Sequence, residues 1–263
     1  MSTTQLLVST SPVVGPPRYT LLVAQQQAEV HAAQRLRHHV FAGEMGAVLH
    51  SSQPGHDVDE FDAHCDHLVV REDSTGEIVG TYRMLPPEGA RCVGGLYCET
   101  EFAGPWRVGL RDALVETGRS CVHPEHRTGA VVSLIWAGIA RYMLLTGYRW
   151  LVGCASVPLR TPGAPDGALA AGVWEAVQAR YLAPERYRVA PHRPWDVETA
   201  SGPQPVTLPP LLRGYLRLGA WVCGPPAYDP DFGVADFLVL LSLDRTGPRY
   251  LNHFLGHVLG QRR

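Results

Sequence analysis

The stretch Leu114–Ala130, L-V-E-T-G-R-S-C-V-H-P-E-H-R-T-G-A, contains the residues of this chain that are best suited to chemistry. Glu116 lies in its apolar first part, which is typical of a strand, and a turn at Arg127 leads into a long helical pattern. Free backbone N–H groups at the start of a helix, together with the helix dipole, favour a bound anion. We therefore predict that a phosphate or pyrophosphate binds at Arg127, Gly129 and Ala130, downstream of a catalytic carboxylate on the preceding strand.

Two arginines stand in otherwise apolar strand patterns. Arg119 follows Glu116 by three residues, and Arg83 lies in the segment T-Y-R-M-L. Burying an unpaired arginine is expensive, so we expect Arg83 to pair with a carboxylate. The candidates are Glu116, Asp59 and Asp62. Glu116 therefore has two interpretations: it is a general base, or it forms an ion pair with an arginine that only braces the strand.

A polar loop and a helical segment hold the remaining binding candidates. Asp59 and Asp62 lie in the loop 51–64, where they either hold the cationic groups of a ligand or belong to a solvated turn. Arg37 and Phe41 lie in a helical pattern among polar residues. The alternative for this pair is an exposed arginine followed by a core phenylalanine.

Hydrophobic periodicity predicts the elements that position these residues. Strands are predicted over residues 19–23, 67–72, 77–85, 113–122, 149–157 and 232–243, and helices over 25–45, 128–146, 168–181, 208–218 and 249–259. Residues 1–18 are predicted to be a flexible tail, and 183–210 a long loop of the kind that forms lids or binding surfaces. Strands and helices alternate, so the predicted fold class is α/β with a mixed, twisted sheet flanked by helices, in one domain over residues 19–263.

The composition excludes several function classes. The chain has 263 residues, of which 45% are hydrophobic and 18% charged, as in an ordinary globular protein. Its formal net charge of -2 gives no support for nucleic-acid binding. All 23 basic residues are arginine. This excludes Schiff-base chemistry and a Walker A lysine, and it favours bidentate recognition of phosphates and carboxylates.

The sequence predicts neither a spanning helix nor a secretory signal. The longest apolar run, Ala130–Ala140, is far shorter than the ~20 residues of a spanning helix, and residues 1–20 lack the basic region of a secretory signal. The six cysteines form no C-x-x-C pair. We therefore expect reduced thiols in a cytoplasmic protein.

Several longer motifs occur along the chain. They are R-x-x-x-F at 37–41, D-E-F-D at 59–62, G-T-Y-R at 80–83, E-x-x-R at 116–119, G-R-S-C-V-H-P at 118–124, G-C-A-S-V-P at 153–158, L-P-P-L-L-R-G-Y at 208–215 and D-P-D-F-G-V-A-D at 229–236. This set resembles the ornithine acyl-ACP N-acyltransferases of the GNAT superfamily, over residues 20–255. Acyl-homoserine-lactone synthases are similar at the same Arg, Phe, Asp and Glu positions. They usually carry a tryptophan where this chain has Ala47, which counts against a lactone synthase.

The resemblance implies a GNAT-like fold and an enzyme that transfers a 3-hydroxyacyl chain from acyl carrier protein to the α-amine of ornithine, forming lyso-ornithine lipid. Glu116 and Arg119 are then the catalytic residues. The implied substrate-binding residues are Arg37, Phe41, Asp59, Asp62 and Arg83. Two alternatives stay open: an N-acyl amino acid or lactone-type signal synthase with another acceptor, and a non-catalytic protein that binds acyl chains or carrier protein.

The implied donor is the acyl-phosphopantetheine of acyl carrier protein, or acyl-CoA, as a co-substrate and without another cofactor. Its phosphate is expected at Arg127, Gly129 and Ala130, while backbone N–H groups near Cys121 and Val122 polarise the thioester carbonyl. The loop R-T-G-A is one residue tighter than in ordinary acetyl-CoA enzymes, which favours carrier protein. The central strands 113–122 and 149–157 are expected to splay and admit the pantetheine arm.

The implied product has one long acyl chain. We therefore expect transient contact with the inner membrane surface, and a separate O-acyltransferase is needed if a two-chain lipid is completed.

Rival chemistries fit the sequence poorly. The cluster His64–His67 matches no standard zinc spacing, so no metal is expected. The segment Gly118–Val122 ends on valine where a nucleophile elbow needs glycine, and no G-x-G-x-x-G motif indicates a dinucleotide. His192 and Asp196 are one residue too close for the His-x4-Asp pattern of glycerolipid O-acyltransferases. Thioester-dependent N-acyl transfer is therefore the leading interpretation.

Overall fold

The computed structural model describes residues 6–9, 18–104, 109–196 and 206–247. The chain divides into two compact units: unit 1 comprises residues 1–93, 117–148 and 248–263, and unit 2 comprises 94–116 and 149–247. One domain over 19–263 was predicted because the sequence shows no linker. Each unit is assembled from separate segments, and the chain passes from unit 2 to unit 1 between Glu116 and Thr117, inside one strand. No linker therefore marks the division.

Unit 1 contains a run of antiparallel strands. β1 (Leu6–Ser9), β2 (Tyr19–Val23), β3 (Asp66–Glu72) and β4 (Ile78–Leu85) are hydrogen-bonded in that order, and β6 (Leu114–Val122) follows β4. The β3–β4 hairpin that the sequence predicts is confirmed, and its register sets His67 opposite Arg83. The prediction of a flexible tail over 1–18 included residues 6–9, which pair with β2.

Three helices of unit 1 accompany these strands. They are α1 (Gln27–His38), α2 (Pro87–Val93) and α3 (Gly129–Thr146). α1 continues into a π-helical turn over His39–Glu44, so the predicted helix over 25–45 changes its winding before it ends.

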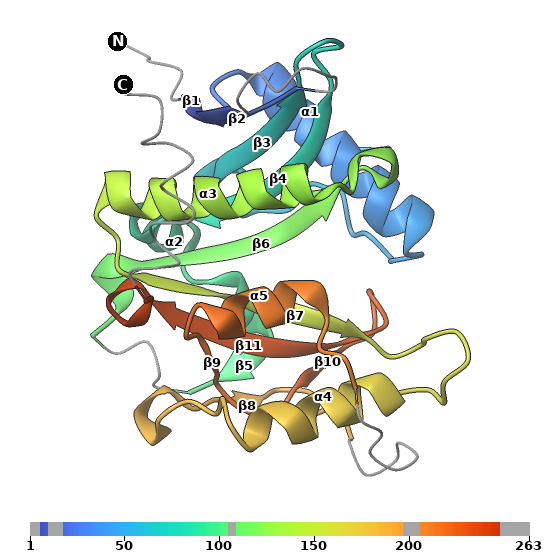
Figure 1. Ribbon diagram of the computed structural model, residues 1–263, viewed down its shortest axis with the longest axis vertical. Helices are drawn as coiled ribbons and strands as arrows, with labels where there is room; N and C mark the ends of the chain where they lie inside the picture. Colours follow the sequence, from blue (N-terminus) through green and yellow to red (C-terminus); the bar gives the residue numbers. More distant parts are fainter. Residues whose placement is uncertain (1–5, 10–17, 105–108, 197–205, 248–263) are drawn as a thin grey trace. The chain divides into compact units, whose positions relative to one another are not determined.

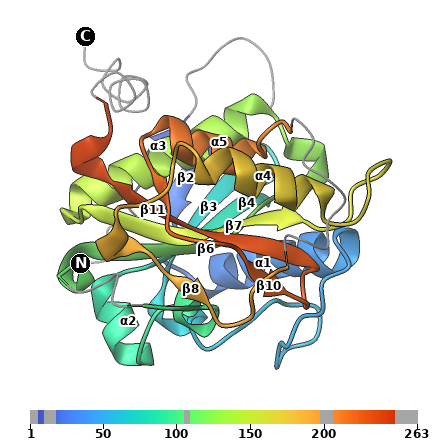
Figure 2. The same ribbon diagram turned by 90° about the horizontal axis from the view of Figure 1, so that it is seen from below.

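Neighbouring residues of β2 face different helices. A Cβ atom on Gly138 of α3 would lie only 2.6 Å from the Leu21 side chain, so this glycine allows a close approach of helix and strand. Leu22, by contrast, clusters with Ala33 of α1 and Val69 of β3. Because side chains alternate along a strand, α3 and α1 cover opposite faces of these strands (Figures 1 and 2).

By length and composition, α3 is the single helix in the described part of the chain that qualifies as a candidate membrane span. It contacts β1, β2, β3 and β4, and its buried residues include Val131, Leu134 and Met143. One face of α3 therefore packs on the strands of unit 1.

Unit 2 contains a mixed sheet, as predicted. Its order is β6, β7 (Trp150–Pro158), β11 (Val234–Ser242) and β10 (Ala227–Asp229), with β9 (Trp221–Val222) also paired to β11. The β6–β7 pair is parallel and includes Glu116 opposite Val152, whereas β11 is antiparallel to β7, β9 and β10. β5 (Phe102–Ala103) and β8 (Ala190–Pro191) form a separate pair. The splay expected farther along β6 and β7 stays a prediction.

The helices of unit 2 also follow the predicted pattern. α4 (Ala168–Gln178) and α5 (Pro210–Arg217) are each shorter than the predicted ranges 168–181 and 208–218. β11 is buried along its whole length, in keeping with a sequence that is apolar except at Asp236 and Ser242. The predicted loop 183–210 contains β8, and its residues 197–205 lie outside the described residues, as does the predicted helix 249–259.

Short helical turns complete the described structure. Those with 3-10 winding are η2 (Asp62–His64), η3 (Tyr97–Thr100), η4 (Arg111–Ala113), η5 (Pro124–His126), η6 (Glu185–Tyr187) and η8 (Leu243–Arg245). Two of them, η2 and η3, present groups to the candidate site.

Candidate active site

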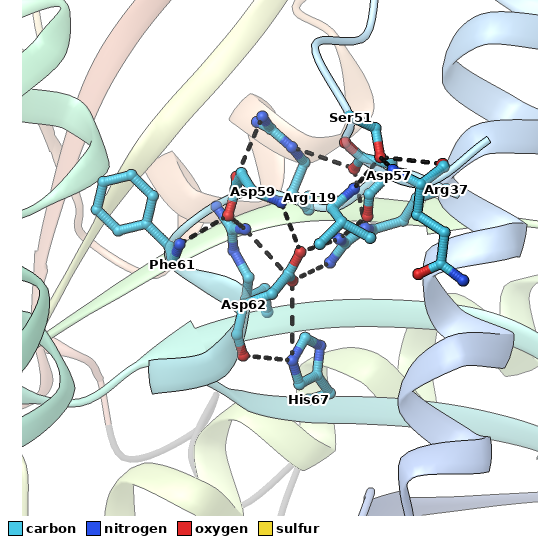
Figure 3. Close-up of polar contacts among 11 residues, drawn as sticks. Arg37, Ser51, Asp57, Asp59, Phe61, Asp62, His67 and Arg119 are labelled. Carbon is cyan, nitrogen blue, oxygen red and sulfur yellow. Dashed lines mark hydrogen bonds and ion pairs between the residues drawn. The ribbon is translucent and has the colours of Figure 1, made fainter. Parts of the chain in front are cut away.

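Arg37 of α1 is fully buried in unit 1 and paired with two aspartates. Its two Nη atoms donate to the two carboxylate oxygens of Asp62, at 2.8 and 2.7 Å, in a fork geometry. Its Nε lies 2.9 Å from a carboxylate oxygen of Asp57, and Nη2 also donates to the Asp57 carbonyl. Figure 3 shows these contacts. The alternative of an exposed Arg37 is therefore excluded, and Phe41 is a buried core residue.

Arg83 of β4 is buried as well, and the expectation that it pairs with a carboxylate is confirmed. Its Nη1 lies 2.5 Å from a carboxylate oxygen of Asp59 and 3.4 Å from one of Asp62. Burial by itself would lower the pKa of Arg83, but the charge of Asp59, followed by that of Cys65 and Asp62, raises it on balance. Arg83 is therefore a permanent buried cation of this network.

Asp62, in the turn η2, joins the two arginines. Burial would raise its pKa, but the hydrogen bonds and charge of Arg37, with the charge of Arg83, outweigh burial and lower the pKa to about 2. The backbone N–H of Asp59 also donates to this carboxylate, at 3.0 Å. Beneath it, His67 donates from Nε2 to the Asp62 carbonyl at 3.1 Å (Figure 3). Burial lowers the pKa of His67, so its neutral form is favoured.

Arg119 completes the network from β6. Its Nε lies 3.3 Å from Asp57 and its Nη2 3.5 Å from Asp59. The side chains of Arg119 and Asp59 are 15% and 22% exposed, whereas Asp57 and Asp62 are buried. Solvent therefore reaches the network at the Arg119–Asp59 pair. A charged ligand can bind there by replacing one of these two side chains as the partner of the other.

Asp57 belongs to this network, although the sequence analysis did not select it. It lies in the same polar loop as Asp59 and Asp62, and their shared loop was the only signal available. The three arginines and three aspartates of the network, Arg37, Arg83, Arg119, Asp57, Asp59 and Asp62, balance one another in formal charge. We refer to these six residues as the Arg–Asp network.

Glu116 lies in the unit 2 part of β6 and is buried. Its two carboxylate oxygens accept hydrogen bonds from the backbone N–H groups of Tyr97, at 2.6 Å, and Cys98, at 2.7 Å. These residues begin the turn η3, so Glu116 caps it. Two charge-assisted hydrogen bonds fix the orientation of the carboxylate.

Three carboxylates gather elsewhere in unit 2. Oxygens of Glu101, Asp229 and Asp236 all lie within 4.8 Å of one another. Ser156 donates to Asp236 at 2.6 Å, and the Cys154 thiol donates to Glu101 at 3.6 Å. Burial, followed by the charges of Asp236 and Asp229, raises the pKa of Glu101 to about 8. Sequence reasoning missed this cluster, for which an aspartate inside the apolar β11 was the available signal.

The predicted donor loop lies at the N-terminus of α3. Thr128 is the N-cap residue, with an extended backbone and no side-chain capping hydrogen bond, and Gly129 and Ala130 are exposed. Arg127 donates from Nε to the Val122 carbonyl at 3.1 Å. Its Nη atoms donate to both carboxylate oxygens of Glu44, at 2.6 and 2.5 Å.

Of the two remaining donor candidates, Val122 is half-buried and Cys121 has a buried thiol. Burial is the main cause that raises its pKa, to about 12, so the thiol is neutral and inert at ordinary pH. Three histidines lie near this end of β6. His39 stacks on His123 with ring centroids 5.4 Å apart, and His126 lies 5.6 Å from His123, edge to face.

Comparisons with known proteins place this chain in a family. Residues 36–137 match the family described as "Acetyltransferase (GNAT) domain". An L-ornithine N(alpha)-acyltransferase of Rhizobium meliloti (strain 1021) is 37% identical over 253 residues, which cover 88% of this chain and 82% of the relative. An L-ornithine N(alpha)-acyltransferase of Brucella abortus (strain 2308) is 34% identical, over 88% of this chain and 87% of the relative. The chain belongs to the L-ornithine N(alpha)-acyltransferase family. This family membership confirms the resemblance and the prediction of an acyltransferase enzyme.

Solved structures show the same fold at low identity. The CoA-dependent acyl-homoserine lactone synthase BjaI, with SAM and isopentyl-CoA, matches with a TM-score of 0.52 and 15% identity, over 90% of this chain and 85% of the other. The AHL synthase LasI matches with a TM-score of 0.53 and 14% identity, over 94% and 100%. With the GNAT domain match, these likenesses confirm the predicted GNAT-like fold of this family member.

Proposed function

We propose that this enzyme transfers an acyl chain to the α-amine of L-ornithine and so forms lyso-ornithine lipid. One observation carries the proposal: proteins named L-ornithine N(alpha)-acyltransferase are up to 37% identical to this chain over most of their length. In the reaction, the amine nitrogen attacks the thioester carbonyl carbon, a C–N bond forms and the C–S bond breaks. The amine loses a proton to a base, and the leaving thiolate takes up a proton.

The acceptor site is proposed in the Arg–Asp network. Ornithine carries two amino groups and one carboxylate, so it needs partners of both signs. Asp59 and Arg119 supply them at the partly exposed edge, where the two side chains are 3.5 Å apart. Arg37, Asp62 and Arg83 hold these two residues in place from the buried side, while Phe41 packs in the core.

Glu116 is the proposed base or anchor for the amine. The amine of an amino acid is mostly protonated at neutral pH, so a group must accept a proton from it, directly or through water. Hydrogen bonds from the backbone N–H groups of Tyr97 and Cys98 fix the orientation of the Glu116 carboxylate. A carboxylate held in a fixed orientation can accept the proton directly from the amine or through a water molecule.

The donor is proposed to be acyl-phosphopantetheine on acyl carrier protein, with acyl-CoA as the other possible source of the same chemistry. The exposed N–H groups of Gly129 and Ala130, with Arg127, are the proposed phosphate site. Backbone N–H groups near Cys121 and Val122 are proposed to polarise the thioester carbonyl. No metal or other cofactor is needed for this transfer.

The chemistry of the product indicates where in the cell the enzyme acts. A single-chain lipid partitions into a bilayer, so we place the enzyme in the cytoplasm with transient contact at the inner membrane face. A two-chain lipid then requires a separate O-acyltransferase.

The first test is intact-mass analysis of products from purified enzyme, 3-hydroxyacyl carrier protein and a mixture of amino acids. N-acyl-ornithine with free carrier thiol is the expected result. Acylation of a different amine would retain N-acyl transfer and replace the acceptor, as in a signal synthase. No transfer to any amine from carrier protein or CoA would overturn the proposal in favour of a binding protein.

The variant Glu116→Gln tests the proposed base. Loss of a general base typically costs 10²–10⁴-fold in rate, so turnover should fall by roughly that factor while binding of carrier protein persists. The uncharged amide still accepts one N–H hydrogen bond at η3, and circular dichroism checks that the fold is retained. Unchanged turnover in Glu116→Gln would reduce Glu116 to the structural cap of η3.

A further inference from the structure

The guanidinium of Arg127 is already occupied by a carboxylate of the same unit. Nη1 and Nη2 donate to the two oxygens of Glu44 at 2.6 and 2.5 Å, which is the fork geometry that a phosphate also uses. The phosphate proposed to bind at Arg127 therefore has to compete with Glu44 for the same face of the guanidinium.

The backbone at Glu44 does not favour a negative charge. Glu44 is the last residue of the π-helical turn His39–Glu44, and the carbonyl end of a helical segment repels anions. Gly43 precedes it, and Gly46, with a φ of 73°, follows closely. The carboxylate is therefore held mainly by Arg127, whose hydrogen bonds are the largest cause that lowers the pKa of Glu44.

The ion pair is also accessible to solvent. The side chains of Arg127 and Glu44 are 44% and 40% exposed, and such surface pairs are weak because water competes for both charges. The phosphodiester of a carrier-protein donor carries one negative charge, as Glu44 does, but at Arg127 it can also accept hydrogen bonds from the backbone N–H groups at the exposed start of α3, so it can replace the carboxylate in this position.

We propose that Glu44 competes with the donor for Arg127: it occupies the guanidinium in the donor-free enzyme and is displaced by the donor phosphate, so that it lowers donor affinity. The inference rests on the proposed donor site. Glu44 belongs neither to the sequence motifs nor to the proposed phosphate site.

The opposite role, in which Glu44 orients Arg127 for the donor, is disfavoured by a second contact. Arg127 donates from Nε to the Val122 carbonyl at 3.1 Å, and this bond fixes the guanidinium independently of Glu44. Removing the Glu44 carboxylate therefore leaves Arg127 oriented and frees the two Nη atoms.

Steady-state kinetics with acyl carrier protein test the inference. Glu44→Ala should lower the donor KM by roughly two- to fivefold, the range expected for an exposed ion pair, with kcat and the ornithine KM unchanged. Glu44→Gln should act in the same direction. Asp166→Ala is the matched control, because Asp166 is an exposed partner of Arg160 at 3.5 Å and its loss changes the net charge equally. The control should leave the donor KM unchanged.

A double variant shows whether Glu44 acts through Arg127. Arg127→Ala should raise the donor KM, and adding Glu44→Ala in that background should have no further effect. Calorimetric titration with 4′-phosphopantetheine alone gives the same comparison without carrier-protein docking: Glu44→Ala should bind it more tightly than the unmodified enzyme.

Each contrary result has a distinct meaning. A higher donor KM in Glu44→Ala would overturn the inference and make Glu44 an orienting residue. If Glu44→Ala changed the donor KM equally in the unmodified enzyme and in Arg127→Ala, the inference would be overturned as well, because Glu44 would then not act through Arg127. An unchanged donor KM in Arg127→Ala, with ornithine still acylated, would overturn both the donor site and the inference while leaving the transfer to ornithine intact.

Discussion

Asp62 is the residue on which the Arg–Asp network depends most. Its two oxygens hold the fork of Arg37, and Arg83 lies 3.4 Å from one of them. Taking charged groups out of water is tolerable only when each finds a partner, and here one carboxylate serves two buried cations. The loss of this single charge therefore leaves three arginines with two aspartates and removes a partner from both Arg37 and Arg83.

Asp62→Asn should destabilise unit 1 strongly. Removing one partner of a buried ion pair typically costs about 3–5 kcal/mol, and chemical denaturation measures the loss. Glu88→Gln is the control, because Glu88 and its partner Arg91 are both more than half exposed and surface changes of this kind stay within about 0.5 kcal/mol. A similarly small loss in Asp62→Asn would show that Asp57 and Asp59 are sufficient partners for the two arginines.

The same variant has a pH signature. The folded-state pKa of Asp62 is lowered from 3.8 to about 2, so its contribution to stability is present above pH 3.8 and is lost as the pH falls through about 2. Asp62→Asn should lack this part of the acid-induced loss of stability. An acid profile parallel to that of the unmodified protein would contradict the assignment.

At the scale of the element, β6 is the strand that links the two candidate sites along the chain. Glu116 lies on its unit 2 part and Arg119 on its unit 1 part. Among the described residues, Arg119 is the one non-glycine residue with a positive φ, 51°. This conformation is strained for an L-amino acid. The positive φ changes the direction of the backbone at Arg119, the residue whose side chain contacts Asp57 and Asp59.

Two substitutions separate the backbone of Arg119 from its side chain. Arg119→Ala and Arg119→Gly both remove the ion pairs, so both should impair turnover. Only glycine relieves the positive φ, so Arg119→Gly should be more stable than Arg119→Ala by about 1 kcal/mol. Thermal and chemical denaturation of the two variants make the comparison, and equal stabilities would mean that the backbone relaxes in both.

At the scale of the whole molecule, the division into two units distributes the charged groups unequally. Unit 1 pairs the buried carboxylates of Asp57 and Asp62 with arginines. Unit 2 gathers Glu101, Asp229 and Asp236 with their oxygens within 4.8 Å of one another. Burial and the two aspartates raise the pKa of Glu101 from 4.5 to about 8. Global stability should therefore respond to pH near neutrality.

Glu101→Gln should flatten that response. A carboxyl group whose folded-state pKa is raised loses stability as the pH rises from about 4.5 through about 8, because the unfolded chain releases the proton first. The unmodified protein should lose stability over this range, and Glu101→Gln should lose less. Denaturation midpoints across that range provide the measurement, and a steeper slope in the variant would contradict the raised pKa.

Local periodicity and residue chemistry determined much of this protein from the sequence. The pleat and the α-helical repeat act over a few neighbouring residues, so the β3–β4 hairpin, β6, β7 and α3 were predictable to within a few residues. The cost of burying an arginine predicted that Arg83 pairs with a carboxylate. The motifs predicted the family, and a relative that is 37% identical over 253 residues confirms it.

Tertiary structure decided which distant groups meet. Arg37 joins Asp57 and Asp62, and Glu44 joins Arg127, across separations that no periodicity encodes. The two units were also invisible in the sequence, since the chain crosses between them inside β6. Ion pairs and unit boundaries arise from the packing of segments remote in sequence, and only the folded chain determines which of many carboxylates lies within reach of each arginine.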